Sequence, residues 1–217
     1  MTDVLLGAEM TLRGLLRRRI SIAVLVLLPL ALYVVSGDTV GRSVRALVFG
    51  LTWAVGTVAF FATVAGRELE PRLAMAGWTR RRLRSARTAA LLAVALVIAL
   101  GFWALVAVDQ AVRSVPWVGG AMLVTAVVAV AIGVAVGALV PTEMEGTLVL
   151  FFLAGLQAVT DPAAGWSVAL PFWSSRELTT YAVDGPAAAS WAAGLGHAMA
   201  VIGAAVMLSR AAGSRRR

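Results

Sequence analysis

Long uncharged stretches alternate with short charged ones along this chain. A membrane-spanning α-helix needs about 20 mostly apolar residues, and runs of that kind lie at residues 20–37, 46–66, 88–108, 117–140 and 186–209. One more apolar run begins at residue 146 but is interrupted by Asp161 and Pro162. The pattern predicts an all-α membrane protein with six transmembrane helices, of which the fifth, at residues 146–170, is broken.

The segment before the first span, residues 1–19, has a pattern of its own. Leucines recur there at near-helical spacing, while Glu9, Arg13 and Arg17 share a polar face. This predicts an amphipathic helix that lies along the membrane interface; the alternative is a cytoplasmic extension of the first span. A signal peptide is not indicated, because the basic cluster lies far from the start and no small-residue cleavage pattern follows.

The longest hydrophilic stretch, residues 67–87, separates the second and third spans. Pro71 suits the first turn of a helix, Gly77 suits a helix end, and Thr79 suits an N-cap. We expect a short helix at residues 71–76, a turn at Gly77, and then a basic helix that continues into the third span.

The broken fifth segment is predicted from its length. The apolar run 146–160 rises about 22 Å as a helix, whereas the hydrocarbon core is about 30 Å thick, and Pro162 removes a backbone donor. We expect a break at residues 160–162, then short re-entrant pieces that form an outer gate with Asp161, Pro162, Trp166 and Trp173. The alternative is an ordinary helix end followed by a partly buried loop.

Composition and charge agree with a single transmembrane domain over residues 1–217. Hydrophobic residues make up 60% of the chain, charged residues 14%, and the mean hydropathy is +0.89; soluble domains carry about 25% charged residues. The net charge is +8, and all 19 basic residues are arginines. Fifteen of them fall on the cytoplasmic side if the N-terminus is cytoplasmic, so the positive-inside rule places both termini there, in a multi-pass protein of the cell membrane.

The side-chain inventory leaves little room for chemistry. With no cysteine, no lysine and one histidine, the chain lacks the residues for thiolate sites and a Walker A loop. We therefore expect no enzyme activity, metal or cofactor on this chain. His197, inside the last span, is interpreted as a helix–helix hydrogen bond or a polar group that faces a pore. A small-residue stripe at Ala129, Gly133 and Gly137 predicts close helix packing.

These features together resemble the ABC-2 family of ATP-binding-cassette transporter permeases. The resemblance is carried by six spans after a basic amphipathic N-terminus, and by a Glu-rich, Leu-x-x-x-Gly, basic pattern after the second span. It is also carried by a broken fifth segment that leads to a Pro- and aromatic-rich extracellular stretch at residues 170–178. The matching residues of the second feature are Glu68, Glu70, Leu73, Gly77, Arg80, Arg81, Arg82, Leu83 and Arg87.

The resemblance implies a function. Such a permease pairs with a second permease copy, or a sister chain, and with two ATPase subunits that hold ATP and Mg²⁺. Coupling to the ATPase would use a water-exposed helix with Glu68, Glu70, Arg72, Leu73 and Gly77. Few charges within the spans favour a lipophilic or amphipathic substrate for export. Alternatives are an accessory or regulatory membrane subunit, a small ATP-independent transporter, and an intramembrane enzyme; no role for nucleic acid is expected.

Overall fold

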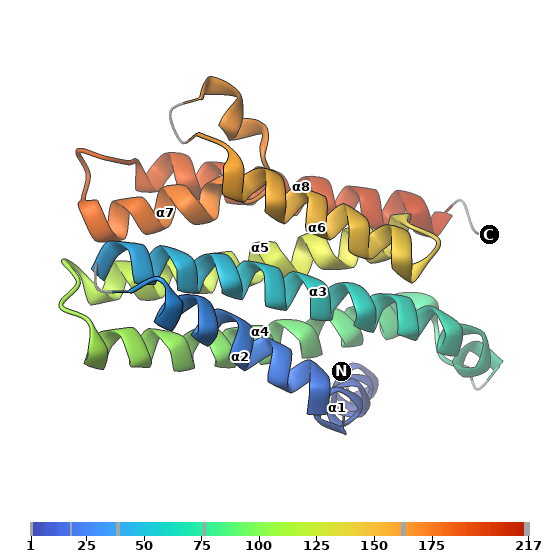
Figure 1. Ribbon diagram of the computed structural model, residues 1–217. Coiled ribbons are helices and arrows are strands. Elements are labelled where there is room, and N and C mark those ends of the chain that lie inside the picture. The colour runs from blue at the N-terminus through green and yellow to red at the C-terminus, as the bar shows by residue number, and fades with distance from the viewer. Residues whose placement is uncertain (1, 18, 38–39, 76, 162–163, 215–217) are drawn as a thin grey trace.

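The protein is a helical bundle in the computed structural model, which describes residues 2–17, 19–37, 40–75, 77–161 and 164–214 (Figure 1). Long helices lie side by side in the bundle, and both termini lie in the half that carries the turn between α3 and α4. The elements in chain order are α1 (Thr2–Arg17), α2 (Arg19–Val35), α3 (Val40–Met75), α4 (Arg80–Asp109), α5 (Val115–Leu139), α6 (Glu143–Val159), the 3₁₀ helix η1 (Gly165–Ala169), α7 (Trp173–Asp184) and α8 (Trp191–Ser214).

Four segments of these helices are long and apolar enough to cross a membrane: Gly41–Arg67, Arg80–Asp109, Val115–Leu139 and Trp191–Ala212. They identify the chain as a membrane protein. The helices α2 and α6 have 17 residues each, which gives a length of about 26 Å at 1.5 Å per residue. Each is therefore somewhat shorter than the roughly 30 Å hydrocarbon core.

The core of the bundle is the contact between α3 and α5. The small-residue stripe of α5 lies against α3, where a Cβ atom on Gly133 would come within 2.2 Å of the Gly56 carbonyl oxygen. A Cβ on Gly137 would meet the Thr63 side chain at 2.8 Å. The stripe thus brings two backbones together as its sequence predicts, and the tertiary structure identifies α3 as the partner.

The helix α1 crosses the bundle. Figure 1 shows it nearly end-on while α3 and α5 run across the picture, so its axis lies across theirs. It packs on α4, where a Cβ on Gly7 would touch Ala86 at 2.9 Å and the Trp78 ring at 3.4 Å. The place of this helix at the membrane interface stays a prediction.

The fifth apolar segment does not form one straight helix. The helix α6 ends at Val159 with Thr160 as its C-cap, η1 follows at Gly165–Ala169, and α7 begins at Trp173. Figure 1 shows η1 on a loop that leaves the bundle between the ends of α6 and α7. Pro162 lies outside the described residues.

One expectation about local structure was wrong. The helix expected at residues 71–76 is not separate, because α3 continues through Pro71 to Met75; a proline inside a helix removes one backbone hydrogen bond, and α3 continues for only about one more turn after it. The stretch at residues 170–178, expected to be extracellular, contains the start of α7, which packs against α5 and α8; its side of the membrane stays a prediction. Ser174 and Leu178 are fully buried there.

Candidate functional site

The turn from α3 to α4 carries the residues that the sequence predicts for coupling to an ATPase; we call Arg67–Arg87 the elbow. The α3 end is closed by backbone bonds from Gly77 N to Ala74 O, 3.0 Å, and from Trp78 N to Leu73 O, 3.1 Å. This is the Schellman arrangement, and Gly77 has the positive φ of +87° that it requires. Thr79 then caps α4 by accepting from Arg82 N, so the turn has a defined geometry.

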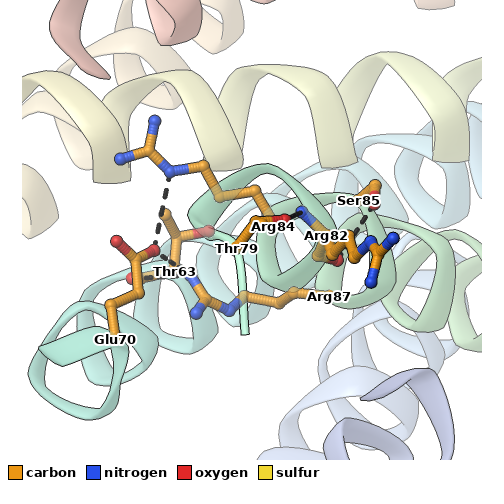
Figure 2. Close-up of polar contacts among 7 residues, drawn as sticks. All are labelled: Thr63, Glu70, Thr79, Arg82, Arg84, Ser85 and Arg87. Atoms are coloured by element: carbon orange, nitrogen blue, oxygen red, sulfur yellow. Dashed lines mark hydrogen bonds and ion pairs between the residues drawn. The ribbon is translucent and has the colours of Figure 1, made fainter. Parts of the chain in front are cut away.

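Glu70 lies inside the elbow. Only 7% of its surface is exposed, and its Oε1 atom lies 3.5 Å from Arg84 Nε and 3.7 Å from Arg87 Nη1. Figure 2 shows the carboxylate of α3 facing the two guanidinium groups of α4. The expectation that Glu70 stays in water was therefore wrong, because the hairpin of α3 and α4 brings two arginines over it.

Arg67 and Arg87 connect the elbow to its neighbours. Arg67 donates from Nη1 and Nη2 to the Val140 carbonyl at the end of α5, both at 3.0 Å. Arg87 donates to the Thr63 carbonyl at 3.4 Å. A cation at a helix C-terminus satisfies carbonyls that have no partner within the helix and offsets the helix dipole. The elbow is thereby tied to the turn between α5 and α6.

The outer surface of the elbow is mixed apolar and basic. Met75 is 83% exposed and Leu69 is about half exposed, and Arg72 is exposed near the α3 end. At the start of α4 the exposed residues are Arg80, Arg81 and Arg82. Of the predicted coupling residues, Arg72 and Gly77 face outward, Leu73 is half-buried, and the side chain of Glu68 lies outside the described residues.

A cavity of about 240 Å³ lies behind this surface, between α1, α3 and α4. Its walls are mainly apolar, with Leu73 and Trp78 from the elbow and Met10 from α1, and Arg87 reaches its edge. The cavity lies between part of the elbow and α1, whereas Ala86 and Trp78 of the elbow lie close to Gly7 of α1.

Of the residues proposed for an outer gate, the structure describes Asp161, Trp166 and Trp173. Asp161 and Trp166 are exposed, whereas Trp173 packs its ring on His197 with the ring centroids 5.2 Å apart. His197 Nε2 lies 2.9 Å from the Val168 carbonyl oxygen; because a carbonyl only accepts, Nε2 donates this bond. His197 therefore joins α8 to η1, which is the structural alternative that the sequence left open.

Polar contacts of α7 hold the broken segment, and sequence reasoning missed them. Arg176 Nη1 donates to the Thr160 carbonyl at 3.4 Å, which links α7 to the α6 end. Glu177 Oε1 accepts from Ser190 N at 2.7 Å, which links α7 to the start of α8. The sequence did contain a signal for a buried helix here: the small or apolar residues Ser174, Leu178 and Ala182 are four residues apart and so share one helical face.

The described residues contain no group of three histidine, aspartate or glutamate side chains that could hold a metal ion. Comparisons with protein-family models, with curated proteins and with solved structures find no match to this chain.

Proposed function

We propose that this chain is the permease subunit of an ABC-2-type transporter, which forms an export path driven by ATP hydrolysis on separate ATPase subunits. The observation that carries the proposal is the elbow: a helix end that continues past the apolar part of α3 and is braced by Glu70 against α4. Because the ion pairs of Glu70 hold the ends of α3 and α4 together, a displacement of the elbow by a docked subunit would move both helices of the bundle.

The proposal includes six membrane crossings, with both termini and the elbow in the cytoplasm of a cell-membrane protein. Four crossings correspond to the long apolar segments, and α2 adds a fifth. The remaining one consists of α6 together with α7, because α7 is only about 18 Å long, too short for a 30 Å core, and it packs beside the start of α3. The arginine distribution supports this orientation, and α1 would lie at the cytoplasmic interface.

Two exposed surfaces of the molecule, one on the elbow and one on α6, support the proposed partners. Two ATPase subunits would supply ATP and Mg²⁺, and the exposed Leu69, Arg72 and Met75 give the elbow a docking surface with apolar and basic groups. A second permease copy or a sister chain would complete the path. The large apolar side chains that α6 leaves exposed support such a contact: Leu148, Phe151 and Phe152. We propose no enzyme activity, metal or cofactor on this chain itself.

The test is association with an ATPase in the native membrane. Affinity-tagged wild-type protein should retain an ATP-hydrolysing partner after solubilisation in mild detergent. Arg72→Glu should lose that partner while the protein remains folded, and the control Arg210→Glu, an exposed arginine at the end of α8, should keep it. Wild-type protein that binds no ATPase, or equal retention by both variants, would count against the proposal.

A further inference from the structure

A second cavity lies at the end of the bundle opposite the elbow. It has a volume of about 330 Å³, within the range of about 300–1,000 Å³ that ligand pockets occupy. The first half of α3, the last turn of α6 and the start of α7 form its walls, and Figure 1 shows α7 beside the beginning of α3. We call it the arginine pocket, after Arg42, Arg45 and Arg176, which line it.

Two buried polar groups of this pocket have no hydrogen-bond partner. Gln157 is 9% exposed and Ser175 is 4% exposed, yet neither Gln157 Oε1 nor Ser175 Oγ forms a hydrogen bond. A buried polar atom without a partner is unfavourable and uncommon in folded proteins. Both residues line the cavity, so a bound molecule there would supply the missing partners.

The charge of the lining identifies the kind of ligand. The described residues that line the pocket include three arginines and no carboxylate. Arg45 pairs with Asp184, and Arg176 donates to the Thr160 carbonyl. A guanidinium has five N–H donors, so the pair with Asp184 uses only part of the capacity of Arg45. The planar fork of a guanidinium matches the oxygens of a phosphate or a carboxylate.

We propose that the arginine pocket binds an oxyanion that also carries a hydroxyl or amine hydrogen. The arginines bind the anionic oxygens, Gln157 Oε1 accepts a hydrogen bond from the hydroxyl or amine of the ligand, and Ser175 Oγ forms a further hydrogen bond to the ligand. Without a donor on the ligand, Gln157 Oε1 would stay unpaired, so an oxyanion alone fits less well.

The apolar side of the pocket indicates where the rest of such a molecule lies. Phe49 lines the pocket. The centroid of its ring lies 6.4 Å from that of Trp53, and the Trp53 centroid lies 5.9 Å from that of Phe151, so the three rings form a row. Phe151 is exposed on α6. If the acyl chain of an amphiphile packed on this aromatic row, the anionic headgroup of the same molecule would lie in the pocket. On this basis, which rests on the proposed function, the pocket selects the anionic head of the exported amphiphile.

Calorimetric titration of the full chain in neutral detergent tests the site without any ATPase. The probes are dihexanoylphosphatidylglycerol, which has a phosphate and hydroxyl groups, and glycerol 3-phosphate, which has the same chemistry without chains. Dihexanoylphosphatidylcholine, which lacks a hydrogen-bond donor, is the control ligand. We expect phosphatidylglycerol to bind more tightly than phosphatidylcholine, and binding of glycerol 3-phosphate would show that the head alone suffices.

Substitutions locate the binding. Arg42→Gln and Gln157→Leu should each weaken phosphatidylglycerol binding about tenfold. The control Arg113→Gln removes the same charge near the same end of the bundle but outside the pocket, and should bind as wild type does. The proposal is overturned if neither anionic probe binds, if phosphatidylcholine binds equally well, or if the pocket variants bind like the control. If the probes bind as expected but wild-type protein retains no ATPase in the association experiment, the proposed function is refuted and the pocket assignment stands.

Discussion

The elbow and the arginine pocket occupy opposite ends of α3, and both place polar groups inside an apolar bundle. At the elbow the buried Glu70 faces Arg84 and Arg87, and Arg67 satisfies the end of α5. In the pocket the buried Gln157 Oε1 and Ser175 Oγ have no partner. Glu70 Oε1 also lacks a hydrogen bond, but it has two ion-pair partners, at 3.5 and 3.7 Å, whereas Gln157 and Ser175 border a cavity. The buried charge with ion-pair partners braces the structure, and the polar groups that line the cavity are available to a ligand.

Loss of the Glu70 carboxylate should have the largest effect on stability. Glu70→Met leaves Arg87, which is nearly buried, without its counter-charge, and removal of one partner of a buried pair costs about 3–5 kcal/mol. Because Arg84 is partly exposed, we expect about 3 kcal/mol. Unfolding of purified protein in mixed micelles measures it, with Glu143→Gln on an exposed helix turn as the control. Equal stability of the two variants would refute the brace.

A substitution in the α3–α5 contact, which connects the two regions, should cause the second-largest loss of stability. Gly133→Ala places a methyl group 2.2 Å from the backbone oxygen of Gly56, and overpacking of this kind costs about 2 kcal/mol. Gly155→Ala is the matched control, since a Cβ there meets nothing within 4 Å, and it should be neutral or slightly stabilising. The same unfolding experiment compares them; a stable Gly133→Ala would mean that the helices are not held this closely.

A substitution in the arginine pocket should increase the free energy of unfolding rather than lower it. Gln157→Leu removes an unpaired buried amide and should stabilise the ligand-free protein by about 1 kcal/mol. The control Thr52→Val, in the same cavity, removes a hydroxyl that donates to the Val48 carbonyl at 2.8 Å, so it should not stabilise. Thermal unfolding in ligand-free detergent measures both, and destabilisation by Gln157→Leu would show that the amide is satisfied after all.

Exposed arginines of the two regions should change stability least. Arg72→Glu at the elbow and Arg42→Gln at the pocket should each alter the free energy of unfolding by less than about 0.5 kcal/mol. Their effects on binding should not overlap: the first variant binds phosphatidylglycerol normally, and the second retains the ATPase. Two binding measurements on the same preparations check this, and a variant that fails in both would show that the two ends are not independent.

Local features of the chain were readable without the fold. Gly77 and Thr79 end and begin helices because their backbone and side-chain bonds lie within a few residues. The end of α6 at Val159 lies where the apolar run 146–160 stops at Asp161. By contrast, the packing of α7 against α5 and α8 could not be read from the chain, since hydropathy treats Arg176 and Glu177 as if they were in water.

The sequence by itself thus determined an apolar, helical membrane chain with a basic elbow and an interrupted fifth segment. Only the tertiary structure decided that Glu70 is buried under arginines, that the Gly133 stripe meets α3, and that Gln157 lines a cavity with three arginines. The reason is physical. Hydropathy and capping depend on neighbours in the chain, whereas the partner of a buried polar group depends on which helices pack against each other and at what rotation.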